Sequence, residues 1–404
     1  MRVAQIYETG LAQLGASVAS VVLNLSKHLS KLGCDVTVIE RGSASGSNPY
    51  LESTEVKEVR VSVKELASIP YKEVRNPIGL CRLILDRSIL AFKLNKVLKT
   101  RYFDVVHVHF PFASSILVNL NKKLRDKIVY TAHIGEERKR FALDSSALLA
   151  LKLFSPDLYL MKRVRKSVVL NEPLKEKLVK KGIPEEKLEV IPNGVNVEDF
   201  NVNEEEIERI RKKYGLEGIT VMFAGTVTPR KGVLQLIRAG EILKLDREVL
   251  FLIVGNLNID REYAQKVMGY AKSRGVNAKF TNFVPYDDLK ALYSACDIFV
   301  LPSFEEGQPL VLLEAMASGK PLIGSYVGGI PMQIREGWNG FLVKPGDKRQ
   351  LAEKIKYLIE NEEERNRMGR NSRKLAEEEF NWKKISEKYL EVYREVSTRN
   401  YNRT

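Results

Sequence analysis

The sequence has few cysteines and no long hydrophobic run among its 404 residues. Its three cysteines, Cys34, Cys81 and Cys296, are odd in number and widely separated, unlike the disulfide framework of a small secreted protein. No apolar stretch approaches the ~20 residues that a membrane-spanning helix needs. The N-terminal residues MRVAQIY indicate a strand and lack the basic, then apolar pattern of a signal segment. We therefore expect a cytoplasmic protein.

Signatures of nucleic-acid binding are also missing. There is no zinc-finger spacing, no aromatic RNA-binding motif and no long basic helix, so we expect no nucleic-acid partner despite a net charge of +14. Residues 1–200 carry 32 Lys and Arg against 22 Asp and Glu, whereas residues 201–404 carry 33 against 29. This basic first half is consistent with a solvated surface, with anionic lipid or with a phosphorylated substrate. The sequence leaves the oligomeric state open.

Short runs rich in β-branched residues alternate with segments of helical period. In the first half these runs lie at 2–7, 35–40, 104–110, 127–133, 167–172 and 188–193, and in the second half at 219–225, 249–255, 278–283, 297–303 and 321–325. The alternation predicts an α/β protein, and its restart predicts two doubly wound, Rossmann-like domains. A polar, turn-rich linker near 193–205 separates an expected N-terminal domain, 1–195, from a C-terminal domain, 196–380.

The C-terminal segment from residue 348 onward has helical composition and no strand-like run. Its last part, 381–404, carries an apolar stripe made by Trp382, Ile385, Tyr389, Val392 and Val396. Such a helix must pack on a protein surface. Periodicity does not distinguish packing on the second domain from a return to the first.

Two glutamates lie eight positions apart in the stretch PSFEEGQPLVLLEAMASGKP, 302–321. Glu306 follows a predicted buried strand, Pro309 suits the first turn of the next helix, and Glu314 lies about a turn further along. Ligands of open α/β sheets bind at the carboxyl ends of the strands, and a carboxylate can accept hydrogen bonds from the adjacent hydroxyls of a sugar. The alternatives are two helix-surface charges or the acid–base pair of a glycosidase.

A pair of cations follows the first strand of the second half. In AGTVTPRKG, Arg230 and Lys231 precede a predicted helix, where the helix dipole opposes them unless an anion lies between them. We therefore favour a phosphate site over a solvated pair, and such a site does not fit a glycosidase. Gly15 after the first strand would let an anion approach the backbone closely, although turn geometry alone would also explain it. Gly255, Gly328 and Gly329, which follow other strands, also suit a close approach to the backbone.

Histidines follow two neighbouring strands of the first half. His109 and His133 lie at predicted strand ends, and His107 shares a side of its strand with His109. We expect His133 to donate a hydrogen bond to a sugar hydroxyl or a phosphate, the alternative being a buried histidine satisfied by the core. No cysteine or carboxylate spacing supports a metal site, so we expect none.

Several blocks together resemble the retaining glycosyltransferases of family 4, which have the GT-B fold. These are EEGQPLVLLEAMASGKPLI, GTVTPRKG, VIPNGVNVEDF, DIFVLPS, VGGIP and NGFLVKPGD, in the family's order. The resemblance implies a hexosyltransferase that moves a sugar from a UDP-, GDP- or ADP-sugar to a hydroxyl of a glycan, a lipid-linked acceptor or a small molecule. It implies that no metal or other cofactor is required. It also implies that the N-terminal domain binds the acceptor and that the final helix returns to this domain.

The same resemblance assigns roles to residues. Catalytic roles fall to Glu306, His133 and Lys231, and His109 and His133 face the acceptor. Glu314 would bind the ribose of the donor. The remaining donor-binding residues would be Gly15, Gly225, Arg230, Gly307, Leu310 and Val311, the last two through their backbone amides.

The sequence departs from the family pattern at three positions of the expected site. Thr226 stands where the family has a basic residue, Met332 where it has a Glu, and Leu14 with Gly15 where it has a pair of glycines. Either Arg230 supplies the charge absent at Thr226, or the donor binds more weakly. Two other function classes share the expected fold, namely a sugar-nucleotide epimerase and a sugar-nucleotide- or lipid-binding scaffold without activity. Intact Glu306, Glu314 and Lys231 argue against the scaffold.

The stretch 76–101 mixes apolar and basic residues, with Asp86 its only acid. This composition suits a helix that lies on an anionic membrane, which would place the protein peripherally at the inner membrane surface. It also suits an ordinary domain helix packed on its sheet.

Overall fold

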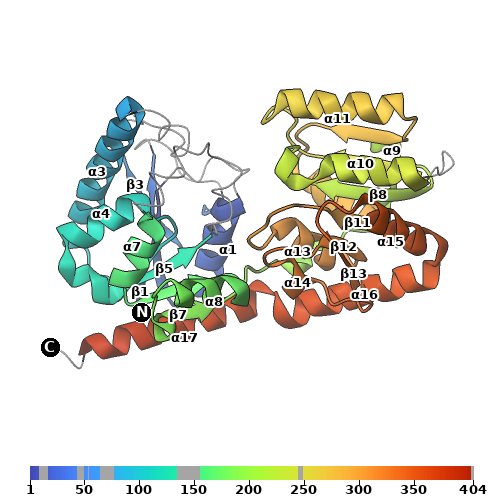
Figure 1. Cartoon of the computed structure of the whole chain (residues 1–404). Coiled ribbons are helices and arrows are strands. Elements are labelled where there is room, and N and C mark those ends of the chain that lie inside the picture. The colour runs from blue at the N-terminus through green and yellow to red at the C-terminus, as the bar shows by residue number, and fades with distance from the viewer. Residues whose placement is uncertain are drawn as a thin grey trace. The chain divides into compact units, whose positions relative to one another are not determined.

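The computed structural model describes residues 1–8, 17–42, 50–52, 54–63, 77–133, 155–243 and 249–401. The chain divides into two compact units, each built around its own parallel sheet (Figure 1). Unit 1 comprises Met1–Asn193 and Trp382–Thr404, and unit 2 comprises Gly194–Asn381.

The sheet of unit 1 has seven strands in the order β3-β2-β1-β4-β5-β6-β7, and every neighbouring pair is parallel. The strands are β1 (Arg2–Tyr7), β2 (Asp35–Arg41), β3 (Lys57–Val61), β4 (Val105–Val108), β5 (Ile128–Ala132), β6 (Lys166–Val169) and β7 (Leu188–Val190). The chain first builds outward from β1 to β3 and then crosses to β4. The adjacent strands β1 and β4 therefore mark the switch point at which such sheets bind ligands.

Helices connect these strands. Those in the described residues are α1 (Ser17–Lys31), α3 (Pro77–Thr100), α4 (Phe112–Leu120), α7 (Pro156–Arg163) and α8 (Glu172–Lys180), with short 3₁₀ turns η1 (Lys122–Lys127) and η2 (Glu185–Lys187). The final helix α17 (Trp382–Tyr401) also belongs to unit 1, where it packs against α1, η1, β4 and β5. Its apolar stripe is buried there, as Trp382, Ile385 and Tyr389 show.

The sheet of unit 2 has six strands in the order β10-β9-β8-β11-β12-β13, again with every neighbouring pair parallel. The strands are β8 (Ile219–Ala224), β9 (Val249–Val254), β10 (Ala278–Thr281), β11 (Ile298–Leu301), β12 (Leu322–Ser325) and β13 (Gly340–Val343). The helices are α9 (Glu204–Tyr214), α10 (Val233–Leu243), α11 (Arg261–Ser273), α12 (Tyr286–Ala295), α13 (Leu310–Ala317), α14 (Ile330–Gln333), α15 (Lys348–Glu360) and α16 (Glu362–Glu379), with η3 (Val197–Phe200) and η4 (Pro229–Lys231). The switch point lies between β8 and β11.

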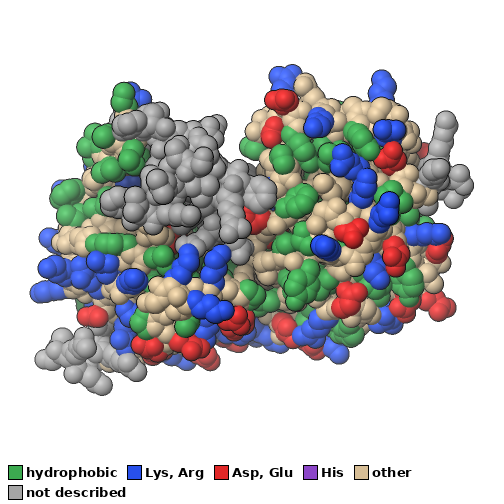
Figure 2. Space-filling view, in the orientation of Figure 1, with side chains coloured by type: hydrophobic (Ala, Val, Ile, Leu, Met, Phe, Trp, Pro, Cys, Tyr) green, Lys and Arg blue, Asp and Glu red, His purple; other side chains and the backbone are tan. Residues whose placement is uncertain are grey.

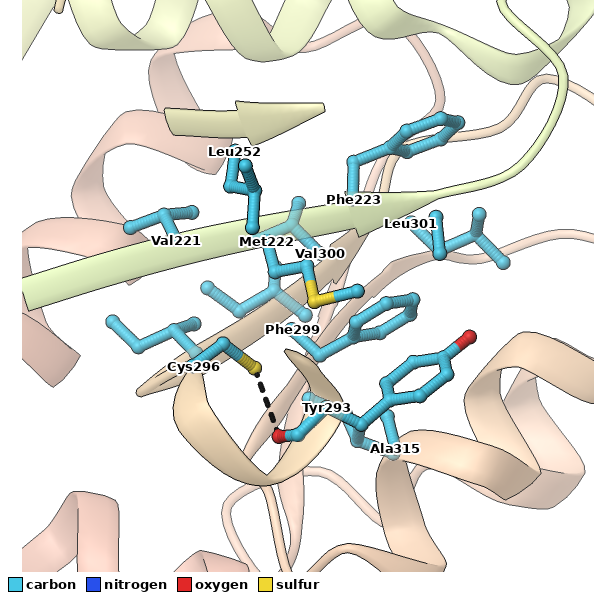
Figure 3. Packing of buried hydrophobic residues seen from close by; sticks show 14 of the residues in the cluster. Val221, Met222, Phe223, Leu252, Tyr293, Cys296, Phe299, Val300, Leu301 and Ala315 are labelled. Atoms are coloured by element: carbon cyan, nitrogen blue, oxygen red, sulfur yellow. Dashed lines mark hydrogen bonds between the residues drawn. The ribbon is translucent and has the colours of Figure 1, made fainter. Parts of the chain in front are cut away.

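The core of unit 2 forms where the central strands meet their covering helices (Figure 3). Met222 and Phe223 on β8 and Phe299 on β11 are fully buried, as expected for parallel strands covered on both faces. Tyr293 on α12 packs its ring 5.5 Å from that of Phe299, and its backbone carbonyl accepts a hydrogen bond from Cys296 Sγ at 3.3 Å. This packing fixes the ring of Tyr293, whose hydroxyl reaches the site described below.

The α/β class with two Rossmann-like sheets is confirmed. A strand lies in every predicted strand region, but β3 and β13 were not predicted. Both are edge strands, and β3 has the sequence KEVRV, in which charged residues interrupt the apolar run. An edge strand needs little hydrophobic surface, so its sequence signal is weak.

Helix α3 buries one side and exposes apolar residues on the other. Leu90 and Leu94 pack into the unit 1 core. Ile78, Leu85 and Phe92 recur every seven residues along the outer side and are 68%, 55% and 60% exposed, and Figure 2 shows hydrophobic side chains gathered over this helix. In the part of the chain that the structure describes, no helix is long and apolar enough to cross a membrane.

Two glycines in helices of unit 2 provide a matched test of packing. A Cβ on Gly369 of α16 would lie 2.2 Å from the carbonyl oxygen of Gly319, whereas a Cβ on Gly269 of α11 would have no atom within 4 Å. We predict that Gly369→Ala lowers the free energy of unfolding by about 1–3 kcal/mol through overpacking. Gly269→Ala should raise it by about 0.5–1 kcal/mol, because alanine favours the helix. Urea denaturation of both variants measures this, and a stabilising Gly369→Ala would contradict the packing.

Candidate active site

Three loops meet at the carboxyl ends of the central strands of unit 2. The backbone N–H of Phe304, after β11, donates to the carbonyl of Arg230, after β8, at 2.8 Å. The N–H of Gly329, after β12, donates to the carbonyl of Gly307 at 2.7 Å. These two bonds hold the loop that carries Glu306 between its neighbours at the switch point.

Glycine is required where the loops touch. Gly328 has φ 53°, and a Cβ there would lie 1.7 Å from the carbonyl oxygen of Glu306. Gly225, at the end of β8, has φ 144°. A Cβ on Gly255 would lie 1.9 Å from the carbonyl oxygen of Gly225. Side chains are therefore excluded at both contacts, and the backbones approach more closely than other residues would allow.

Glu306 pairs with both predicted cations. Its Oε1 lies 2.5 Å from Lys231 Nζ and accepts a hydrogen bond from Ser303 Oγ at 2.8 Å, while its Oε2 lies 3.6 Å from Arg230 Nη1. The Arg230 guanidinium also donates to the carbonyl of Glu305 at 2.7 Å. Glu306 is 5% exposed. Burial alone would raise the pKa of Glu306, but the charges of Lys231 and Arg230 outweigh it and hold this pKa below its usual value.

Glu314 is held by a different partner. Its Oε2 accepts a hydrogen bond from the hydroxyl of Tyr293 at 2.7 Å. Burial raises the pKa of Glu314, and the Tyr293 hydrogen bond partly offsets this effect. Oε2 is thereby fixed in position, and the carboxylate keeps further lone pairs with which it can accept hydrogen bonds from a ligand.

Leu310 and Val311 begin α13, one turn before Glu314. The first amides of a helix have no acceptor within the helix and carry a partial positive charge. The preceding residue, Pro309, is fixed by a hydrogen bond from Gln333 Nε2 to its carbonyl at 3.0 Å. The start of α13 is therefore a fixed set of donors suited to an anion.

Unit 1 brings its predicted histidines together at the ends of β4 and β5. His109 Nδ1 and His133 Nε2 lie 2.8 Å apart, and their rings stack at a centroid distance of 5.1 Å. Burial lowers the pKa of His133 to about 3 and holds the pKa of His109 well below its usual value. Both rings are therefore neutral at pH 7.

Several site residues were not predicted from sequence. Ser303, three residues before Glu306 in the same loop, orients Glu306, and Tyr293 on α12 orients Glu314. The closeness of Ser303 can be read from the sequence, whereas that of Tyr293 depends on the fold. Glu8, after β1, accepts hydrogen bonds at 2.9 Å from the amides of Ala113 and Ser114 at the start of α4. Its position at the carboxyl end of a central strand was the only available signal.

One predicted site residue, Gly15, lies outside the described residues. Among the described side chains, no group of three or more His, Cys, Asp or Glu is placed to hold a metal ion.

Two family profiles match consecutive parts of the chain. The profile described as Glycosyltransferase Family 4 matches residues 18–199, and the profile described as Glycosyl transferases group 1 matches residues 206–375. An uncharacterized glycosyltransferase of Methanocaldococcus jannaschii is 30% identical over 331 residues, which are 79% of this chain and 83% of that protein. The chain belongs to glycosyltransferase family 4.

Other relatives of this glycosyltransferase align along most of its length. D-inositol 3-phosphate glycosyltransferase of Corynebacterium glutamicum is 26% identical over 396 residues, or 93% of this chain and 90% of that protein. The solved structure of HepE from Anabaena in complex with UDP-glucose covers 97% of this chain and 99% of its own, with a TM-score of 0.74 at 19% identity. The predicted enzyme class and the predicted GT-B fold are confirmed.

The buried pair in this glycosyltransferase predicts a pH-dependent stability. Glu306→Gln should lower the free energy of unfolding at pH 7 by about 3 kcal/mol, because it removes the buried carboxylate that pairs with the partly buried Lys231 and Arg230. Glu306 stabilises the fold fully above its unfolded-state pKa near 4.5, and this contribution is lost as pH falls through the lower folded-state pKa. The difference between wild type and variant should therefore shrink on acidification.

The control is an exposed ion pair of the same unit. Arg335 and Glu379 are both 49% exposed, so Glu379→Gln should change stability by less than about 1 kcal/mol. Denaturant titrations between pH 3 and roughly pH 8 make the comparison. Equal effects of the two substitutions at pH 7 would contradict a buried, charged Glu306.

Proposed function

We propose that this family 4 enzyme is a retaining hexosyltransferase that uses a nucleotide-diphosphate sugar as donor and an acceptor hydroxyl as nucleophile. The observation that carries the proposal is the buried Glu306 carboxylate held against Lys231 and Arg230 at the β8–β11 switch point. It combines a carboxylate for sugar hydroxyls with two cations for phosphate in one rigid site.

The donor would spread across this site by charge. Lys231, Arg230 and the first amides of α13, those of Leu310 and Val311, would bind the diphosphate. Glu306 and the adjacent Gly307 would contact the hexose, and Glu314 would accept hydrogen bonds from the ribose hydroxyls. The complex of HepE with UDP-glucose supports a nucleotide sugar as donor.

The reaction would follow from that placement. The bond between the anomeric carbon and the diphosphate oxygen breaks, and the acceptor oxygen bonds to the same face of that carbon, so configuration is retained. The acceptor proton passes to the departing diphosphate oxygen. Lys231, Arg230 and the α13 amides would stabilise the charge that develops on this leaving group, so no metal ion would be needed.

Unit 1 would bind the acceptor, with His109 and His133 beside it. Neutral His133 would hydrogen-bond an acceptor hydroxyl without attracting the diphosphate, whereas both ring nitrogens of neutral His109 are already bonded to His133 and Gln5. The similarity to D-inositol 3-phosphate glycosyltransferase supports a small polyol among the acceptors to test.

A donor screen tests the proposal. Purified enzyme would be mixed with UDP-glucose, GDP-mannose and ADP-glucose in EDTA, and thermal stability and sugar release would be measured. A cognate donor at a hundred times its dissociation constant should stabilise the fold by about 2.7 kcal/mol. No stabilisation and no sugar release with any donor would overturn the proposal, and inversion of the free sugar nucleotide without acceptor would instead indicate an epimerase.

We predict different kinetic effects for the two glutamates. Glu314→Ala should mainly raise the donor KM, because its ribose contact is equal in ground and transition states. Glu306→Ala should mainly lower kcat, because it contacts the sugar whose geometry changes. Steady-state kinetics on the donor identified by the screen separate the two effects, and unchanged constants for both variants would refute the assignment.

Arg230 would replace the cation that the family carries at the position of Thr226. We predict that Arg230→Ala lowers kcat/KM. The loss should correspond to about 1.5–3 kcal/mol of transition-state stabilisation, as expected when a charge-assisted hydrogen bond to phosphate is removed. Adding Thr226→Arg should restore part of the loss. A single Arg230→Ala variant with wild-type kcat/KM would show that Arg230 does not play this role.

Helix α3 suits contact with an anionic membrane. Its exposed apolar residues Ile78, Leu85 and Phe92 are accompanied by exposed basic residues, namely Arg82, Lys93, Lys96 and Lys99. Asp86, its only acid, is fully buried and paired with Arg41 at 2.7 Å. Apolar and basic residues thus share the outer side of α3, and membrane contact would bring unit 1 to a lipid-linked acceptor.

We predict that the enzyme co-sediments with vesicles containing anionic phosphatidylglycerol but not with neutral phosphatidylcholine vesicles. Salt at about 0.5 M should release it through screening. Phe92→Glu should abolish binding, because it places a charge on the exposed apolar stripe. Glu353→Gln on α15 serves as a surface-charge control and should bind as wild type does. Equal recovery with both vesicle types would favour a soluble acceptor.

A further inference from the structure

A continuous buried hydrogen-bond chain runs through unit 1 from His133 to helix α17. His133 Nε2 lies 2.8 Å from His109 Nδ1, and His109 Nε2 lies 2.7 Å from Gln5 Oε1. Gln5 Nε2 donates to the hydroxyl of Tyr393 at 3.1 Å, and that hydroxyl lies 2.6 Å from Nδ1 of His107. Beta strands β1, β4 and β5 and the final helix each contribute to this chain.

The chain continues for two more groups. His107 Nε2 lies 2.7 Å from the hydroxyl of Thr131, which lies 3.2 Å from the hydroxyl of Tyr389. Gln5, His107 and Thr131 are fully buried, so each must satisfy its polar atoms within the protein. A neutral imidazole has one donor nitrogen and one acceptor nitrogen. The direction of one bond therefore fixes the direction of the next.

Gln5 lies at the centre of the chain and sets its direction. Its carbonyl oxygen faces His109, so His109 carries its proton on Nε2 and its Nδ1 accepts from His133. Its amide nitrogen donates to Tyr393, whose hydroxyl donates to His107 Nδ1. Both branches assign the proton to Nε2. Rotating the amide by a half-turn would reverse every bond and move all three protons to Nδ1.

We propose that Gln5 is a positioning residue that holds His107, His109 and His133 in one shared Nε2–H tautomer, so that His133 offers Nδ1 as an acceptor to a substrate hydroxyl. His133 Nδ1 is buried and has no hydrogen-bond partner among the residues that the structure describes. This inference rests on the proposed role of His133. It differs from the sequence-based expectation, in which His133 donates the bond.

The chain also links the substrate side of unit 1 to α17. Tyr389 and Tyr393 are one helical turn apart, and their rings lie 5.4 Å and 5.7 Å from the His107 ring. Gln5 touches Tyr393 directly, whereas Tyr389 is the last group beyond Thr131. Loss of the Tyr393 hydroxyl therefore releases the Gln5 amide, but loss of the Tyr389 hydroxyl does not.

Nitrogen NMR of the histidine rings tests the shared tautomer directly. The protein has only four histidines. The fourth, His28, has Nδ1 2.8 Å from the backbone carbonyl of Asn24, so it must carry a proton on Nδ1. In the whole protein labelled with ¹⁵N-histidine, His107, His109 and His133 should show Nε2–H, and His28 should differ. A mixture among the three would overturn the coupling, and three Nδ1–H rings would overturn the acceptor role.

Kinetics test whether Gln5 acts through His133. With UDP-glucose as probe, Gln5→Leu should lower kcat for sugar release about tenfold and leave KM within about twofold, as for loss of one oriented hydrogen bond. In a His133→Ala background, Gln5→Leu should cause no further loss. An equal loss in both backgrounds would show a structural effect and overturn the proposal.

A second pair of variants tests the proposal if Gln5→Leu does not fold. Tyr393→Phe should lower kcat, as Gln5→Leu does, while the kcat of the matched Tyr389→Phe should stay within about twofold of wild type. Equal effects of the two would also overturn the proposal. An inactive wild type with all donors would refute the proposed function instead, and the tautomer measurement would still decide whether the chain is coupled.

Discussion

A polar or charged group buried in a protein must find its partners within the protein, and both sheets bury such groups at the ends of their central strands. In unit 2 the buried group is Glu306, which is satisfied by Lys231, Arg230 and Ser303. In unit 1 the buried groups are His107 and His109, satisfied by Thr131, Tyr393, Gln5 and His133. Because the partners come from several strands, loops and helices, satisfying these groups fixes how the segments pack.

The two units use different electrostatics for this purpose. The unit 2 site holds ionised groups, because its carboxylate and its cations pair with one another. The loops that carry them approach closely because glycine lies at the points of contact. The unit 1 cluster is neutral, because burial without a nearby anion keeps imidazole unprotonated. A charged site suits a diphosphate, whereas a neutral donor–acceptor chain suits the hydroxyls of a sugar or a polyol. This difference supports the proposal that unit 2 binds the donor and unit 1 the acceptor.

Helices α3 and α17 serve unit 1 in ways that a hydrophobic pattern shows only partly. In α17 the apolar stripe includes Tyr389, whose hydroxyl enters the buried chain, so the helix supplies polar groups to the strands as well as apolar surface. In α3, Leu90 and Leu94 face the core while Leu85 and Phe92 face outward. Both sets are leucine-rich or aromatic, and only the packed structure shows which of them the sheet covers.

Local sequence patterns were enough to predict the alternation of strands and helices, the two sheets and the placement of Glu306, Lys231, Arg230, His109 and His133 at strand ends. These follow from local periodicity and from the rule that parallel strands present their carboxyl ends at one edge. Which of these residues contact one another became clear only from the packed structure. Gln5 and Tyr393 are 388 positions apart, and Lys231 and Glu306 are 75 apart. Hydrogen bonds and ion pairs of that separation depend on how loops and helices pack, and no local pattern encodes their geometry.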